Sequence, residues 1–117
     1  MTAKIAQSIR VGEAAADARP GYGFDLYPGA EVTGSLMDGM SLSIRTDDSF
    51  AEIVAFYEGQ LIEKGWQIES RDMNDGKVIL SGVMTVSRQE TMTISVAHTE
   101  RGQGHYHLFF AKLLNGA

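Results

Sequence analysis

The sequence predicts one α+β domain, in which one main helix packs on a four- to six-stranded antiparallel sheet in the order β-β-α-β-β-β-β. Three observations predict this fold. One long segment carries apolar residues at helical spacing, several segments alternate apolar and polar residues, and glycine-containing turns separate them. A chain of 117 residues fits one domain and can bury roughly two-thirds of the surface that its unfolded form exposes.

The first 21 residues differ in composition from the rest of the chain. Ile5 and Ile9 lie four residues apart, and the small, polar stretch GEAAADARPG follows them. This pattern is compatible with a short amphipathic helix and equally with a tether that leads into the domain. We therefore expect residues 1–21 to form a tether or short helix and residues 22–117 to form the single α+β domain.

Two strands open the domain. In the stretch YPGA, residues 27–30, proline presets φ at the second position and glycine accepts a positive φ at the third, which indicates a type II turn. A strand near residues 31–36 follows, and Asp38-Gly39 is a pair typical of a type I′ hairpin. Residues 40–46, MSLSIRT, alternate apolar and polar side chains, so they predict a half-buried strand.

The helix is predicted from residues 47–65, DDSFAEIVAFYEGQLIEKG. Ser49 and Glu52 are spaced to form a capping box, in which each side chain satisfies a backbone N–H that the first helical turn leaves free. An apolar stripe follows at helical spacing, consisting of Phe50, Ile53, Val54, Tyr57 and Leu61. Gly65 is placed to adopt the left-handed conformation that ends a helix, and Trp66 can fold back on that end.

Four further strands are predicted from WQIESRD, KVILSGVMTVS, TMTISVAH and HYHLFFAKLL. Gly82 within the second of them indicates a bulge or a close approach of another backbone. The last strand is apolar on both faces and therefore needs two covers. The helix is one cover. The second is either residues 1–20 or a partner chain, and the latter alternative predicts a homodimer.

Composition excludes several classes of protein. The net charge is −5, and no stripe of lysine and arginine compensates for it, so nucleic-acid binding is not expected. There is no cysteine, and no apolar run approaches the ~18 residues of a transmembrane segment. The N-terminus lacks the apolar core of a signal peptide. Location stays open: periplasmic or envelope-anchored if an export signal was removed, and cytoplasmic otherwise.

Several of these stretches together resemble one family. The stretches YPGA at 27–30 and TDDS at 46–49, followed by Phe56, Tyr57, Leu61, Gly65 and Trp66, resemble the signature of small bacterial domains of unknown function. Such domains are often predicted to be exported or lipid-anchored. The resemblance covers about residues 22–113 and implies a helix laid across an antiparallel sheet, with no catalytic residue. A tether to a lipidated cysteine is usual in the family, and this chain has no cysteine.

All three histidines lie in one stretch, HTERGQGHYH, at residues 98–107. Two hairpin registers are open. With a two-residue turn, His98 pairs opposite His105 and His107 lies beside them, so three imidazoles converge as a zinc site with an open position requires. With a loop one residue longer, His98 faces Tyr106, and His105 and His107 point to the other face. The second register aligns the apolar residues better, and we favour it.

No motif in the sequence indicates catalysis. Asp47 and Asp48 directly precede a helix, where carboxylates are typical caps and dipole complements rather than an acid–base pair. The leading hypothesis is a non-enzymatic binding or interaction module of unknown specific function, in the bacterial cell envelope or elsewhere, whose partner is another protein or a second copy. The alternative is a metal-binding domain that holds zinc with His98, His105 and His107.

A third hypothesis is a carrier for a small ligand between helix and sheet. It requires a cavity of about 300 Å³ or more. An interior filled by Trp66, Phe50 and Phe110 would argue against it.

Overall fold

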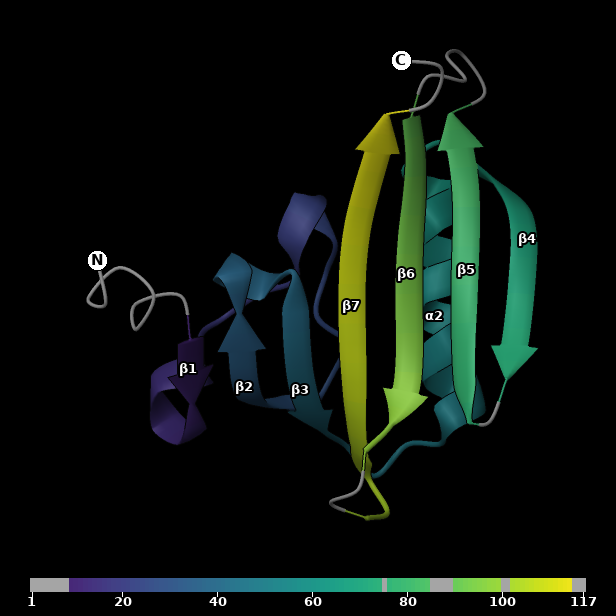
Figure 1. Cartoon of the computed structure of the whole chain (residues 1–117). Coiled ribbons are helices and arrows are strands. Elements are labelled where there is room, and N and C mark those ends of the chain that lie inside the picture. Colours follow the sequence, from purple (N-terminus) through teal and green to yellow (C-terminus); the bar gives the residue numbers. More distant parts are fainter. Residues whose placement is uncertain (1–8, 75, 85–89, 100–101, 115–117) are drawn as a thin grey trace.

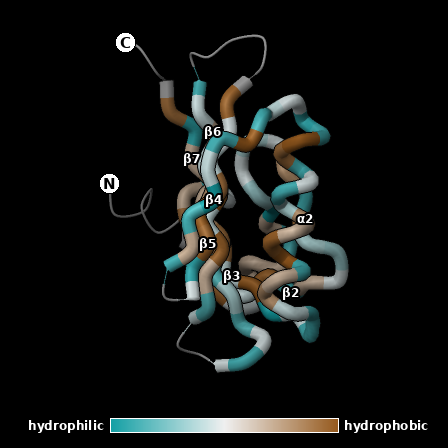
Figure 2. Tube along the Cα trace, turned by 90° about the vertical axis from the view of Figure 1, so that its right-hand side faces the viewer, coloured by the Kyte–Doolittle hydropathy of each residue, from teal (hydrophilic) through white to brown (hydrophobic). Residues whose placement is uncertain are grey.

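The structure is a computed structural model that describes residues 9–74, 76–84, 90–99 and 102–114. In this part of the chain, antiparallel strands form one sheet in the order β1-β2-β3-β7-β6-β5-β4, and helix α2 crosses one face of it (Figure 1). Figure 2 shows the same two layers from the side. The elements are β1 (Ile9–Val11), β2 (Glu31–Leu36), β3 (Ser41–Arg45), α2 (Phe50–Glu63), β4 (Trp66–Asn74), β5 (Lys77–Met84), β6 (Glu90–His98) and β7 (His105–Leu114).

The predicted fold class is confirmed, since the order from β2 onward is β-β-α-β-β-β-β. The short strand β1 is an addition at the edge of the sheet, where it pairs with β2. After it, Ala15 and Ala18 are buried, and the Phe24 ring stacks on Phe110 at 5.8 Å, on the side of the sheet that faces α2. The chain between β1 and Phe24 does not cross in front of β5, β6 or β7 in Figure 1. The predicted boundary between residues 21 and 22 stays a prediction.

Helix α2 begins and ends as its sequence predicts. Ser49 Oγ accepts a hydrogen bond from Glu52 N at 3.2 Å, and Glu52 Oε1 accepts one from Ser49 N at 3.1 Å, which confirms the capping box. Gly65 has a φ of 92° and donates its N–H to the carbonyl of Ile62 at 3.1 Å. Because glycine adopts this left-handed conformation without steric cost, the helix stops here and the chain turns into β4.

The turn between β2 and β3 differs from the predicted Asp38-Gly39 pair. Positive φ values extend over Met37 (52°), Asp38 (53°) and Gly39 (92°), so the turn starts one residue earlier. A side chain at Gly39 would place its Cβ 1.9 Å from the carbonyl oxygen of Arg19. The N-terminal segment thus packs directly against this turn, and a residue with a side chain at position 39 would collide with it.

The space between α2 and the sheet is filled by apolar side chains. Ile44 and Leu42 of β3 pair with Tyr106 and Leu108 of β7, while Ile94 of β6 pairs with Phe110. The largest fully buried side chains include Tyr57, Phe110, Leu42, Ile53 and Leu61. Trp66 is also buried and Phe50 packs against this core. This packing argues against a carrier site between the two layers.

Candidate functional site: a polar pocket where helix α2 begins

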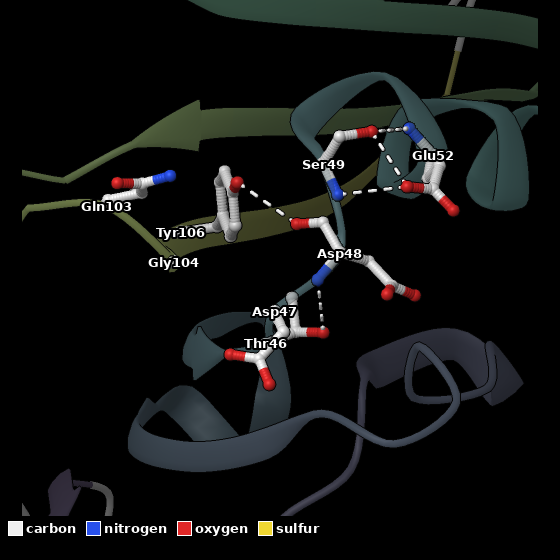
Figure 3. A pocket seen from close by; sticks show the side chains of 8 residues that line it. All are labelled: Thr46, Asp47, Asp48, Ser49, Glu52, Gln103, Gly104 and Tyr106. Carbon is white, nitrogen blue, oxygen red and sulfur yellow. Dashed lines mark hydrogen bonds between the residues drawn. The ribbon is translucent and has the colours of Figure 1, made fainter.

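A pocket of about 460 Å³ lies where β3 passes into α2 and meets the loop between β6 and β7 (Figure 3). We call it the helix-start pocket. The residues that line it are Thr46, Asp47, Asp48, Ser49, Glu52, Gln103, Gly104 and Tyr106.

Hydrogen bonds hold the two sides of the helix-start pocket together. Thr46 N donates to the carbonyl of Gly104 at 2.9 Å, which ties the β3–α2 junction to the β6–β7 loop. Asp48 N donates to Thr46 Oγ1 at 3.2 Å, and the Tyr106 hydroxyl donates to the carbonyl of Asp48 at 3.3 Å. The backbone of the junction is therefore fixed before any ligand binds.

The segment before β2 contributes a hydrogen bond to the side chain of Asp48. Tyr27 N donates to the Tyr57 hydroxyl at 3.0 Å, and that hydroxyl donates to the carbonyl of Asp25 at 2.9 Å. Gln60 of α2 also bonds the Asp25 carboxylate through Nε2 at 3.2 Å. These contacts place the segment alongside α2. The Tyr27 hydroxyl therefore reaches Asp48 Oδ2 and donates a hydrogen bond to it at 2.5 Å.

The phenols of this arrangement are both held in their neutral form. Donation of a hydrogen bond to Asp48 raises the pKa of Tyr27 to about 12, with burial and the charges of Asp48 and Glu52 adding to the effect. Burial likewise raises the pKa of Tyr57. Both hydroxyls therefore keep their protons at physiological pH, and Tyr27 remains a donor to Asp48.

The electrostatic character of the helix-start pocket is negative. Asp47, Asp48 and Glu52 contribute carboxylates, and none of the described residues that line the pocket is a lysine, arginine or histidine. The start of a helix carries a partial charge of about +0.5, which three carboxylates outweigh. A cation or a donor-rich neutral molecule fits such a site, whereas a phosphate does not.

The sequence predicts the carboxylates at the start of the helix, but it does not predict that they line a pocket. The predicted capping role is correct for Glu52. Gln103 and Gly104 come from a loop far along the chain, and the bond from Thr46 to Gly104 joins them to the junction. No local pattern in GQG signals this partner, because the contact depends on which strands are neighbours in the sheet.

The structure does not bring the three predicted metal ligands together. His98 lies opposite Tyr106 and Ala97 lies opposite His107, which is the favoured register with the longer loop. His98 therefore faces the α2 side, where its ring stacks on Phe50 at 4.6 Å, while His105 and His107 point to the other face. Among the residues that the structure describes, no group of three His, Cys, Asp or Glu side chains is arranged to hold a metal ion.

His107 has a partner of a different kind. Its Nε2 lies 2.6 Å from the hydroxyl oxygen of Ser41, on the neighbouring strand β3. Burial lowers the pKa of His107 below its ordinary value, and the nearby charge of Lys77 lowers it further. The imidazole is thus kept neutral in the sheet, where it hydrogen-bonds a hydroxyl.

Within the described ranges, no helix is both long enough and apolar enough to cross a membrane. No curated protein and no solved structure matches this chain. The sequence model of the START domain-like family matches residues 30–104, which run from the turn before β2 to the loop before β7. Domains of this kind are generally binding modules rather than enzymes. Since the match covers more than half of the chain, the protein belongs to the START domain-like family.

Proposed function

We propose that this protein is a non-enzymatic binding module whose helix-start pocket holds a small, positively charged organic molecule. The observation that carries the proposal is a pocket of about 460 Å³ with three carboxylates and no cationic side chain among its described lining residues. Its volume falls in the range of about 300–1,000 Å³ that small-molecule sites occupy. Membership of the START domain-like family supports ligand binding in general.

The bonds of the pocket favour a ligand with an amine or guanidinium group. Asp48 is oriented by Tyr27, and Glu52 is oriented by the backbone and hydroxyl of Ser49. Binding then costs little ordering of these side chains, and such preorganisation favours affinity. Asp47, Asp48 and Glu52 are all exposed, so an incoming cation can reach their carboxylates. Thr46 and Gln103 add neutral hydrogen-bonding groups.

The test is calorimetric titration of the protein with a linear diamine, a guanidinium compound and a quaternary ammonium compound, with a dicarboxylate of matched length as the opposite charge. Asp47→Asn removes one charge and leaves the shape unchanged. Because an exposed ion pair contributes up to about 1 kcal/mol, we expect affinity for the cations to fall up to roughly fivefold. The matched control is Glu63→Gln, which removes a carboxylate from the opposite end of α2.

Two results would refute the proposal. One is the absence of binding for all three cations at low salt. The other is equal weakening by Asp47→Asn and Glu63→Gln, since that would reflect net charge rather than the pocket. We further propose the bacterial cell envelope as the setting, a location that only the resemblance of the YPGA and TDDS stretches supports. Fractionation of cells that produce the full gene product tests it.

A further inference from the structure

The face of the sheet that points away from α2 has a distinctive composition. The strand registers identify the side chains that β3, β5, β6 and β7 direct to this side. They are Ser41, Ser43, Arg45, Lys77, Ile79, Ser81, Val83, Thr91, Thr93, Ser95, Ala97, His105, His107, Phe109, Ala111 and Leu113. We call this set the outer face. It contains no acidic residue, its lysine and arginine (Lys77 and Arg45) lie at strand ends, and in Figure 1 no described segment lies in front of β5, β6 and β7.

Such a composition is unusual for a surface that meets only water. About 25% of the residues of an average globular domain are charged, and 21% of this whole chain is charged. Most side chains of the outer face are nevertheless partly exposed, Phe109 and Ile79 included, and Leu113 is 60% exposed. Low charge together with an exposed aromatic side chain is a feature that this face shares with the buried centre of protein–protein interfaces.

The shape of the outer face suits another sheet. Serine, threonine and alanine predominate between the larger side chains, so a second sheet can approach to the spacing of about 10 Å at which sheets stack. Phe109 and Ile79 flank Ser95 across three neighbouring strands, where they can interdigitate with the side chains of an opposing sheet. A helix or a flexible peptide would not need so broad a surface of small residues.

The distribution of charge favours a second copy of this chain as the source of the opposing sheet. Each copy of the chain carries a net charge of −5, so two copies repel one another over most of their surfaces. The outer face avoids this repulsion because its centre is uncharged. Among the described residues, the charged groups lie at the margins of this face: Lys77 at the start of β5, Arg45 at the end of β3 in an ion pair with Glu31 of β2, and Asp72 on β4.

The available area is also adequate. Strands β2 and β4 extend the outer face on either side. With strands spaced about 4.8 Å apart and advancing about 3.3 Å per residue, the six strands from β2 to β4 make a surface roughly 29 Å wide and 20–30 Å long, of which the four strands of the outer face are roughly two-thirds. The area of the six-stranded surface, roughly 600–850 Å², is close to the ~800 Å² per partner of a standard specific interface. The described part of residues 1–21 leaves this face uncovered, because β1 pairs with the edge of β2 and Ala15 and Ala18 join the core on the α2 side.

From these observations we infer that the outer face binds the outer face of a second copy of this chain, so that two sheets stack between two outward-facing helices. The helix-start pocket of each copy remains open on the far side of its own sheet. This self-association is independent of the ligand proposed above.

The experiment measures the mass of the full chain in solution by sedimentation over a wide concentration range. We expect a dimer that dissociates on dilution. Thr93→Lys places a charge at the centre of the outer face, opposite Ala111 and Ser81, and should shift the protein to a monomer. Ile62→Lys adds the same charge on the exposed side of α2, where Ile62 is 62% exposed, and should leave the dimer intact.

A second measurement guards against a misfolded Thr93→Lys variant. The chain has no cysteine, so Thr93→Cys and Ile62→Cys each introduce a unique thiol. Alkylation of the first should slow as protein concentration rises, while alkylation of the second should not change. A wild-type monomer at every concentration overturns the inference. So does a dimer in which Thr93→Lys has no effect and the Thr93→Cys thiol stays reactive, since that dimer uses another surface.

Discussion

At the scale of single residues, His107 shows how burial in the sheet controls the protonation state of an imidazole. Its Nε2 lies 2.6 Å from Ser41 Oγ, and the strand pairing places Ser43 and Ala97 beside it. None of these neighbours is anionic, and Lys77 lies close enough to disfavour a further positive charge. Protonation would therefore cost free energy in the folded protein that it does not cost in the unfolded chain.

This environment predicts a loss of stability in acid. Burial lowers the pKa of His107 in the folded state, so below the ordinary value of about 6.5 the unfolded chain binds this proton more readily than the folded one. The free energy of unfolding should fall as pH drops below about 6.5 and should gain nothing from His107 above it. Urea denaturation at pH 7.5 and pH 5.0 measures this, with His107→Gln as the test variant.

His107→Gln removes the titrating group, so the stability gap between wild type and variant should narrow at pH 5.0. His98→Gln, on the opposite face of the same hairpin, is the control for loss of an imidazole. Should the gap between wild type and His107→Gln be the same at both pH values, the explanation is wrong.

At the scale of elements, helix α2 depends on its first turn. Ser49 and Glu52 satisfy one another's backbone N–H groups, and this capping box also shapes one wall of the helix-start pocket. Ser49→Ala removes the acceptor for Glu52 N, so we expect a loss of about 1 kcal/mol in the free energy of unfolding. Chemical denaturation gives the value directly.

Ser49→Asp is the informative companion to Ser49→Ala. Aspartate is as good a cap as serine, and its charge complements the helix dipole. The Asp variant should retain wild-type stability. If both variants lost the same amount, the effect would arise from packing and not from the cap.

The elements that the sequence predicts well are those that depend on neighbouring residues. The YPGA turn forms with Ala30 N bonded to the carbonyl of Tyr27 at 3.1 Å and Gly29 at a φ of 81°. Gly82 was expected at a bulge or close approach, and its Cβ would indeed lie 3.2 Å from the Gln67 carbonyl, opposite a register shift in β4. Local steric rules suffice for these features.

The features that sequence reasoning missed depend on residues far apart in the chain. The turn at 37–39 packs against the backbone of Arg19, and strand β1 pairs with the edge of β2. The helix-start pocket requires Thr46 to meet Gly104. Periodicity within a segment carries no information on such long-range contacts, because the order of strands in the sheet determines them.

At the scale of the whole molecule, the protein consists of two groups of strands joined by one ladder. Strands β4 to β7 form an antiparallel meander of sequence neighbours, while β1 to β3 form a smaller group. The sheet is continuous only because Ser41–Arg45 pairs with His105–Phe109. One side of the helix-start pocket comes from the residues after β3 and the other from the hairpin before β7, so the same ladder assembles the site.

The β3–β7 ladder has a consequence for the kinetics of folding. Pairing strands that are about 60 residues apart requires closure of a long loop, which is slower and entropically more costly than forming successive hairpins. We expect the meander to form first and β3 to join it after the rate-limiting barrier. Ile94 in β6 and Ile44 in β3 are matched probes, because both are fully buried.

Replacing either isoleucine with valine should cost about 0.5–1.5 kcal/mol. Stopped-flow measurements should show that Ile94→Val mainly slows folding and that Ile44→Val mainly accelerates unfolding. Equal effects on both rates would mean that the ladder forms with the meander. If β3 joins last, the unfolding barrier depends on the contacts that complete the pocket, and a ligand that bridges its two sides would extend the lifetime of the folded protein.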